Sequence, residues 1–364
     1  MVYTARMTRP VFFTVGPSEI FPSVAGYMAE AMELGIPSLS HRGKQFEELF
    51  RSVEISLKEL FRLPDGYRIF FVSSGNEGME RFIENCVREK SGHIVYGAFS
   101  KKWSKISRDL GRKTEIATFP DGETPDVAGA VFSPDTEGIC ITQNETSTGG
   151  MIASSDIAAL HMRYPDALIG VDIVSAAPVI ELDFTVVDYA FFSVQKCFGL
   201  PAGLGVLIAS PRALMKAEES AKTGSIGSYH NFLELKKWGD IGQTPETPNV
   251  LDIYLLSRVL QEMLAEDVAV MRRTIADRAN RLYALFKSNP TYTAFVRDSA
   301  CRSLTTPVLV VEGGSPRVTS ALKEKGIIVG SGYGENKEKH IRIGNFPAHT
   351  EEHFSALLSA LGSF

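Results

Sequence analysis

The chain has few cysteines and no long apolar segment, and both features narrow the kind of protein it can be. Its four cysteines are scattered over 364 residues and form no Cys-x-x-Cys pair, which is typical of reduced thiols in a cytoplasmic protein. No run approaches the roughly 18 apolar residues that a membrane-spanning helix needs. Residues 1–13 also lack the apolar core of a secretory signal. We therefore expect a cytoplasmic protein that does not enter a membrane.

Positive charge is also in short supply. The 38 lysines and arginines are outnumbered by 43 aspartates and glutamates, which gives a formal net charge of −5. This balance argues against a nucleic-acid partner or an anionic membrane surface, so a small anionic ligand would need a local positive pocket. The hydrophobic content of 44% and the length of 364 residues are those of a globular protein with one large and one smaller domain.

The segment 187–210 contains the strongest single signal for chemistry. Two apolar runs, Tyr189–Ser193 and Leu204–Ala209, predict strands that are covered on both faces. The loop between them holds one lysine, Lys196, in surroundings almost without charge. Loss of hydration would lower the pKa of this amine, which suits a nucleophile toward an aldehyde such as pyridoxal 5′-phosphate (PLP). The alternative is a lysine at a strand end whose side chain reaches solvent.

Other functional candidates also follow apolar strands. A strand over residues 68–73 leads into Ser-Gly-Asn-Glu-Gly at 74–78 and then into a helix, where unpaired main-chain N–H groups can bind a phosphate. Asp172 directly follows the strand 167–171, and a carboxylate at such a buried position needs a cation. Phe99 follows another strand and can stack on a planar ligand.

The order of these elements predicts the fold class. Apolar strands alternate with helical stretches between residues 65 and 210, which is typical of an α/β fold with a mostly parallel sheet and helices on both faces. Each polar candidate falls at the carboxyl end of a strand, where open α/β sheets bind their ligands. We therefore expect the candidate residues to meet at one edge of the sheet.

A smaller α+β domain is expected toward the C-terminus. Residues 225–249 are rich in glycine, serine, threonine and proline, and Pro245 and Pro248 prevent a continuous helix there, so we expect this segment to be irregular. One long helix over 251–287 is predicted to bridge to this domain. The large domain, with an N-terminal arm, would thus comprise residues 1–250, and the bridging helix with the small domain would comprise 251–364.

Seven segments, in their order along the chain, resemble motifs of the class V, fold-type I PLP-dependent aminotransferases: SHRGKQFEEL, SSGNEGME, QNETSTGG, VDIVSA, SVQKCFGLPAGLGV, TPETPN and HIRIGNFP. The resemblance runs from Phe12 to Pro347. Within the class, the motifs are most similar to those of phosphoserine aminotransferases, and next to those of serine–pyruvate and alanine–glyoxylate aminotransferases. The resemblance implies a homodimer with PLP near the subunit interface, a large sheet domain and a small C-terminal domain.

Motif positions in the resemblance imply the cofactor site. Lys196 would hold PLP as a Schiff base, and Asp172 would pair with the pyridine nitrogen and keep it protonated. The ring of Phe99 would lie over the cofactor, and Thr146 would approach its phenolic oxygen. The phosphate would be bound by the remaining residues, of which Thr244 would reach the cofactor of the other subunit: Gly75, Asn76, Glu77, Gln195 and Thr244.

The resemblance also implies how a substrate is bound. Arg342 would bind the α-carboxylate, for which a bidentate guanidinium is suited, and His41 and Arg42 would approach a distal phosphate across the dimer. Two positions depart from the phosphoserine aminotransferase pattern. Glu77 stands where an arginine is common, and the segment Ile327–Gly334 contains no arginine. The implied reaction is ping-pong transamination of O-phospho-L-serine with 2-oxoglutarate.

Three other functions remain open from the sequence. The same chemistry could act on serine or alanine with glyoxylate or pyruvate. A class V lyase such as a desulfurase would need a mobile cysteine, and Cys301 is the only one in a suitable loop. A dimer that has kept the fold without PLP would be no enzyme. His349 and His353 are four residues apart but have no further ligand nearby in the sequence, so no metal is expected.

Overall fold

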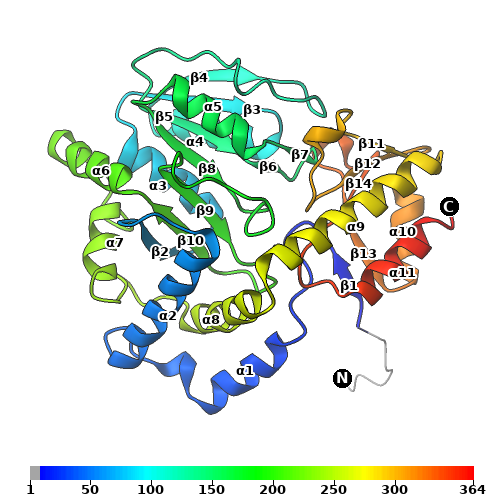
Figure 1. Cartoon of the computed structure of the whole chain (residues 1–364), viewed down its shortest axis with the longest axis horizontal. Coiled ribbons are helices and arrows are strands. Elements are labelled where there is room, and N and C mark those ends of the chain that lie inside the picture. The colour runs from blue at the N-terminus through cyan, green and yellow to red at the C-terminus, as the bar shows by residue number, and fades with distance from the viewer. Residues whose placement is uncertain (1–8) are drawn as a thin grey trace.

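Seven strands form the larger sheet of the computed structural model, which describes residues 9–364 (Figure 1). Their order is β2-β10-β9-β8-β5-β3-β4. β10 is antiparallel to both of its neighbours, and the other adjacent pairs are parallel. All strands except β10 therefore point the same way. They are β2 (Arg68–Val72), β3 (Lys90–Val95), β4 (Lys113–Thr118), β5 (Gly138–Thr142), β8 (Leu168–Asp172), β9 (Tyr189–Ser193) and β10 (Gly205–Ala209).

Helices cover both faces of this sheet, as its apolar strands predict. In β9, Tyr189 and Phe191 pack on one side and Ala190 and Phe192 on the other, because successive side chains of a strand alternate. The first side is covered by α3 (Gly75–Cys86), α4 (Ala98–Asp109), α6 (Pro211–Thr223) and α7 (Phe232–Gly239). The second is covered by α2 (Lys44–Phe61), α5 (Ser154–Arg163) and α8 (Val250–Ala265), and α1 (Val24–Glu33) joins the same core. This α/β architecture confirms the predicted fold class.

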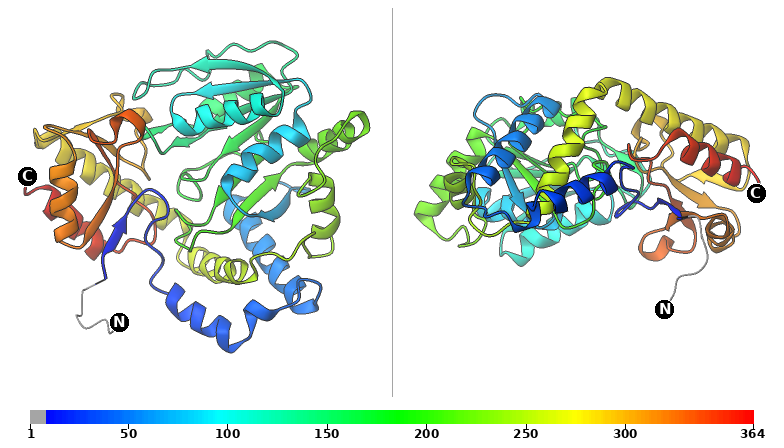
Figure 2. Two further views of the ribbon diagram at one scale, coloured as in Figure 1. Left: turned by 180° about the vertical axis from the view of Figure 1, so that it is seen from behind. Right: turned by 90° about the horizontal axis from the view of Figure 1, so that it is seen from below.

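A second, five-stranded sheet has the order β1-β13-β14-β12-β11 and lies to one side of the large sheet (Figure 2). Its strands are β1 (Val11–Phe13), β11 (Tyr292–Ala294), β12 (Val308–Val311), β13 (Ile327–Ser331) and β14 (His340–Arg342), and a separate hairpin joins β6 (Asn144–Glu145) to β7 (Gly150–Met151). α9 (Val268–Ser288), α10 (Pro316–Glu324) and α11 (Glu351–Leu361) complete the core of the small sheet. In α11 the Thr350 side chain accepts a hydrogen bond from the His353 N–H and so caps the helix.

The N-terminal strand belongs to this small sheet. β1 pairs in parallel with β13, and the His349 ring stacks on Phe13 at 4.1 Å between centroids. The sequence placed this arm with the large domain, because nothing local in residues 11–13 shows which sheet the strand will join. The strand joins the small sheet because β1 pairs with β13, which lies more than 300 residues further along the chain.

The predicted bridging helix is in fact two helices. α8 ends at Ala265 and α9 begins at Val268. Asp267 adopts a left-handed conformation (φ 63°), and its side chain accepts a hydrogen bond from the Ala269 N–H at 2.9 Å. This is an N-cap, and it interrupts the apolar periodicity that predicted one helix. Upstream, α7 lies within the segment expected to be irregular and ends before Pro245.

All four cysteines are free, and three of them are buried. Within residues 9–364, no helix is long and apolar enough to cross a membrane.

Candidate active site

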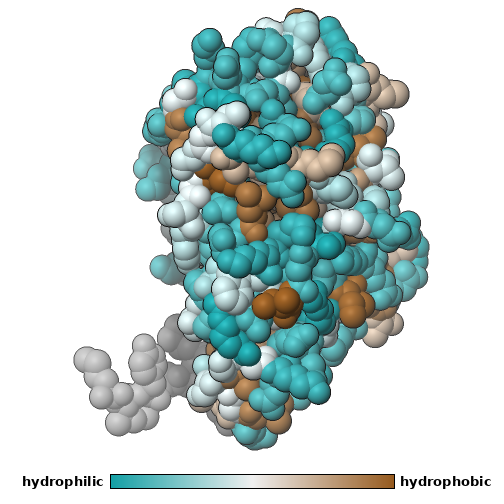
Figure 3. All heavy atoms as spheres, turned by 90° about the vertical axis from the view of Figure 1, so that its left-hand side faces the viewer, coloured by the Kyte–Doolittle hydropathy of each residue, from teal (hydrophilic) through white to brown (hydrophobic). Residues whose placement is uncertain are grey.

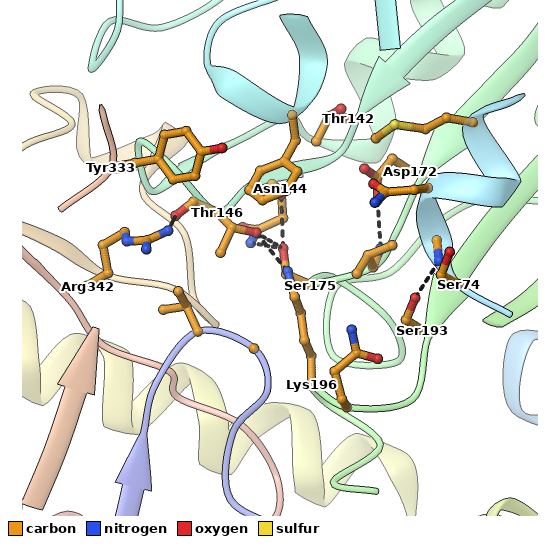
Figure 4. A pocket seen from close by; sticks show the side chains of 18 residues that line it. Ser74, Thr142, Asn144, Thr146, Asp172, Ser175, Ser193, Lys196, Tyr333 and Arg342 are labelled. Atoms are coloured by element: carbon orange, nitrogen blue, oxygen red, sulfur yellow. Dashed lines mark hydrogen bonds between the residues drawn. The ribbon is translucent and has the colours of Figure 1, made fainter. Parts of the chain in front are cut away.

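A cavity of about 290 Å³ lies at the carboxyl ends of the large sheet's strands (Figure 4). The strands that run in the same direction end at the same edge, and so the loops after β2, β3, β5, β8 and β9 meet there. Most residues that the sequence singled out line this cavity: Gly75, Asn76, Phe99, Thr146, Asp172, Gln195, Lys196 and Arg342.

Lys196 projects from the β9–β10 loop into the cavity and is only 7% exposed. Its Nζ lies 3.1 Å from Thr146 Oγ1 and 5.4 Å from the centroid of the Phe99 ring. Burial lowers the pKa of this amine, against an opposing effect of Asp172. Gly16 (φ +123°) leaves room for the lysine stem, because a Cβ there would lie 2.6 Å from Lys196 Cε. The amine is therefore held in place and easier to deprotonate than a surface lysine.

Asp172, the last residue of β8, is a buried carboxyl group that forms no ion pair within residues 9–364. Its Oδ1 accepts a hydrogen bond from the Val174 N–H at 2.9 Å. Burial raises its pKa to about 7, although the bond from Val174 and the charge of Lys196 act in the opposite direction. A cationic group bound beside Asp172 would lower that pKa and ionise the carboxylate.

The turn between β2 and α3 forms one wall of the cavity. A Cβ on Gly75 would lie 2.8 Å from Val174 Cγ2, so only glycine fits there. The Gly75 N–H donates to Ser193 Oγ at 2.7 Å, and the Glu77 N–H donates to Ser74 Oγ at 3.4 Å. Among residues 9–364, the Asn76 N–H has no hydrogen-bond partner. This free donor and the positive end of the α3 dipole make the turn suitable for an anion.

Arg342 supplies a second cationic side chain to the cavity. Its Nε donates to the Ser331 carbonyl at 2.6 Å, and its Nη1 donates to the Thr146 carbonyl at 3.4 Å. Burial lowers its pKa, and in the described part of the chain it forms no ion pair with a carboxylate. A guanidinium that is fixed through carbonyls in this way is free to bind the carboxylate of a ligand.

Sequence reasoning missed several residues that line the cavity. Ser175 accepts hydrogen bonds from Asn144 Nδ2 at 2.8 Å and from Thr146 Oγ1 at 3.0 Å. The ring of Tyr333 lies 5.9 Å from that of Phe99. Six of the missed residues fall inside quoted motifs, Asn144 and Ser175 among them, whereas Gly16 and Tyr333 lie in segments without a pattern. The full set is Val15, Gly16, Ser74, Met79, Thr142, Asn144, Val174, Ser175, Ser193 and Tyr333.

His41, Arg42 and Thr244 do not line this cavity. The Arg42 guanidinium donates to the carbonyls of Thr244 at 2.7 Å and Pro245 at 3.0 Å, and it stacks 3.7 Å from the ring centroid of Trp238. Arg42 thus holds the loop that contains Thr244. The two loops form one unit outside the subunit's own cavity.

The side chain of Glu77 also points away from the cavity. Its carboxylate accepts from the Ser73 N–H at 2.9 Å and pairs with His230, whose other ring nitrogen lies 2.8 Å from Glu246 Oε2. Burial opposes the charged form of His230, but its interactions with the carboxylates of Glu246 and Glu77 raise its pKa to about 9. Burial likewise opposes ionisation of Glu77, yet His230 and Ser73 lower its pKa to about 2. A charged histidine therefore links α3 to the loop at 244–248.

We expect the ion pairs of His230 with Glu77 and Glu246 to stabilise the fold at neutral pH and to lose this effect at alkaline pH. Because the pKa of His230 rises from 6.5 to about 9 on folding, its contribution is complete below pH 6.5 and is lost as the pH rises through about 9. The shift corresponds to roughly 3 kcal/mol. Urea unfolding over about pH 6–10 should show this loss in the wild type, and H230N should show much less of it.

Asparagine is the replacement because it tolerates the left-handed backbone of His230 (φ 53°). The matched control is His353→Gln, since glutamine can keep the capping box at the start of α11. Equal alkaline losses in H230N and in the wild type would show that His230 does not carry the effect.

The fold and the cavity together define a known class of enzyme. The model of the class-V aminotransferase family matches residues 11–341, and the chain belongs to this family. A phosphoserine aminotransferase from Cytophaga hutchinsonii is 39% identical, with 97% of this chain and 98% of that chain covered and a TM-score of 0.95. A phosphoserine aminotransferase from Rhodococcus opacus (strain B4) is 29% identical over 96% of this chain and 93% of its own length.

A PLP-bound phosphoserine aminotransferase from Trichomonas vaginalis, 18% identical, has the same fold with a TM-score of 0.80 and covers 97% of this chain and 99% of its own. The protein is thus an aminotransferase, and its family implies PLP as cofactor. The identification made from sequence motifs is confirmed.

The cavity fits PLP on its own evidence. Thr142 Oγ1 and Asn144 Oδ1 are buried there and have no hydrogen-bond partner in the part of the chain that the structure describes, so polar groups of a ligand could satisfy both. Asp172 forms no ion pair within residues 9–364, as described above, and a protonated ring nitrogen would provide one. The Asn76 N–H suits a phosphate, and Lys196 offers the amine.

Proposed function

We propose that the protein transfers the amino group of O-phospho-L-serine to 2-oxoglutarate by a ping-pong mechanism with PLP. The observation that carries the aminotransferase chemistry is the convergence of Lys196, Asp172 and Arg342 on one cavity. The substrate is supported by two similar proteins whose names are phosphoserine aminotransferase, one of them 39% identical over nearly the whole chain.

Each of the three residues has a distinct task. PLP, when bound, supplies a carbonyl that takes up the amino group and a ring that accepts electron density. Lys196 holds the cofactor and, once its amine is free, moves the α-proton of the substrate as general base and acid. The Asp172 carboxylate keeps the ring nitrogen protonated. Arg342 binds the α-carboxylate and so orients the substrate's Cα–H bond toward Lys196.

Alanine or serine with glyoxylate or pyruvate is the second candidate, and one observation favours it. Lys196 and Arg342 are the only cationic side chains that line the cavity among residues 9–364. With Glu77 turned toward His230, this subunit offers no further cation for a distal phosphate. Such a cavity also suits an amino acid with an uncharged side chain.

A donor screen separates the two candidates. The PLP-loaded protein is assayed with phosphoserine, serine and alanine against 2-oxoglutarate, pyruvate and glyoxylate. We expect the highest kcat/KM for phosphoserine with 2-oxoglutarate. A higher kcat/KM for serine or alanine would show that phosphoserine is not the substrate, while the aminotransferase chemistry would still hold. Failure to bind PLP would indicate a protein that has kept the fold without the cofactor.

The desulfurase alternative has little structural support. Cys301 is partly exposed and does not line the cavity, and burial raises its pKa. A reactive thiolate needs the opposite shift.

We also propose a homodimer in which the loops at His41–Arg42 and Thr244 complete the partner's site. Several large apolar side chains are exposed on α1, α2 and the turn after α7, which lie together in Figure 1: Met32, Leu34, Ile55 and Ile241. The face shown in Figure 3 is mostly hydrophilic, with separate apolar patches that a partner could cover. We further propose that the enzyme is cytoplasmic and that its substrates are small amino acids and keto acids.

If the cofactor contacts both subunits, it should tighten the dimer, because a ligand bound only by the assembled state stabilises that state. Sedimentation over a dilution series should give a lower dimer dissociation constant for the PLP-loaded protein than for the apoprotein. Identical dissociation constants, or a fully active monomer, would contradict the shared site.

A further inference from the structure

Glu145 is a fully buried carboxylate with no cationic partner. Its exposed fraction is 0%, and no ion pair involves it within the described residues 9–364. It is satisfied instead by neutral donors. The main-chain donors are the N–H groups of Ser100 at 2.9 Å, Phe99 at 3.1 Å and Ser147 at 3.2 Å. The hydroxyls of Ser147 at 2.7 Å and Ser100 at 3.0 Å also donate to it. A buried charge of this kind is tolerated only where several donors converge on it.

The donors belong to the start of α4. The N-cap residue Gly97 has no side chain to cap the helix, and a Cβ there would lie 2.3 Å from Glu145 Cγ. The Ala98 N–H donates to Ser147 Oγ at 2.9 Å, and the next two N–H groups donate to Glu145. The first turn of α4 is thus capped from the β6–β7 hairpin, and the negative charge lies at the positive end of the helix dipole.

This capped turn carries Phe99, the aromatic residue of the cavity. Its ring centroid is 5.4 Å from Lys196 Nζ. Thr146, which lies between the two capping residues, has its hydroxyl 3.1 Å from the same amine. The side chains of Glu145 and Ser147 therefore face α4 while Thr146 faces the lysine. One short segment fixes two walls of the cavity.

We propose that Glu145 is a positioning residue that fixes Phe99 over the cofactor ring by holding the main-chain N–H groups of Phe99 and Ser100. The proposal rests on the proposed function in one respect, which is that PLP is the group stacked by Phe99. The carboxylate suits the task because both of its oxygens only accept hydrogen bonds. A glutamine would put an NH₂ group in place of one carboxylate oxygen, and a main-chain N–H that faces this group has no lone pair to accept from it.

The first test needs no cofactor. Amide hydrogen exchange of the full-length apoprotein should show a loss of protection at Phe99 and Ser100 of about tenfold or more in E145A, with a smaller loss in E145Q. The matched control is Glu137→Ala. Glu137 also accepts main-chain N–H groups, those of Arg88, Glu89 and Lys90, but outside the cavity. In this control, exchange at the start of α4 should not change.

The second test is a double-mutant cycle on PLP binding. Titration of the apoprotein with PLP, followed by its absorbance and circular dichroism, is done for E145A, F99A and E145A/F99A. We expect E145A to weaken binding about as much as F99A does, and the double variant to bind no more weakly than F99A, because Glu145 acts through that ring. E137A should bind PLP as the wild type does.

The outcomes are distinct. Additive losses in the cycle, or unchanged PLP affinity in E145A, would overturn the positioning role even if α4 frays. Failure of the wild type to bind PLP would refute the proposed function, while the exchange experiment still decides whether Glu145 holds the start of α4. If E145A does not fold, E145Q keeps the size of the side chain and serves in both tests.

Discussion

Replacing Lys196 by alanine should reduce transamination by about 10⁴-fold or more, because the change removes both the amine that holds the cofactor and the group that moves the α-proton. The fold should survive. Lys196 makes one side-chain hydrogen bond, to Thr146, and burial already lowers its pKa, so removal of a desolvated amine should not weaken the core. The measurements are steady-state turnover and thermal unfolding of the apoprotein.

Two controls make the Lys196 result specific. Lys105→Ala removes an exposed amine that pairs with Asp109 on α4, and its turnover should equal that of the wild type. A small primary amine added to K196A should restore part of the rate, since it can occupy the space left by the side chain. Turnover by K196A close to that of the wild type would refute the central assignment.

Asp172→Asn should lower kcat by roughly 10²–10³-fold, which is the usual effect of removing one preorganised electrostatic partner at a reacting centre. A neutral amide cannot keep a ring nitrogen protonated.

The stability of the apoprotein should not fall in the same way as the rate. Because burial raises the pKa of Asp172 from 3.8 to about 7, ionisation of this carboxyl destabilises the fold progressively between those pH values and fully above them. Above pH 7, apo-D172N should therefore be at least as stable as the apo wild type.

This opposite response of rate and stability distinguishes Asp172 from a merely structural residue. Asp188 provides the comparison, since it is a buried aspartate directly before β9, outside the cavity, and accepts hydrogen bonds from the Ile169 N–H and Ser210 Oγ. D188N should keep the kcat of the wild type, because Asp188 does not line the cavity. Unchanged turnover in D172N would mean that Asp172 does not act on the cofactor.

Much of the architecture is local in origin, and the sequence could predict it. The apolar run Tyr189–Ser193 is strand β9 with the same bounds, and the run Leu204–Ala209 is β10 with one further residue at its start. Runs of this kind are buried wherever they lie, so their pattern alone identifies them as strands of a covered sheet. Parallel strands end at one edge, and this is why Lys196 and Asp172 could be placed in one site before any contact was known.

Contacts between distant segments decided the rest. No periodicity shows that Arg42 packs on Trp238 or that β1 pairs with β13, because each pairing joins residues about 200 to 300 positions apart. The same holds for the direction of the Glu77 side chain.

The sequence by itself determined the enzyme class, the sheet, and the position of Lys196 and Asp172 at one edge of it, because these depend on short motifs and on strand ends. Only the tertiary structure decided that Glu77 pairs with His230 and that Glu145 caps the helix bearing Phe99. The physical reason is that a polar side chain has several possible partners. Which of them it meets depends on the packing of the whole chain and not on its neighbours in sequence.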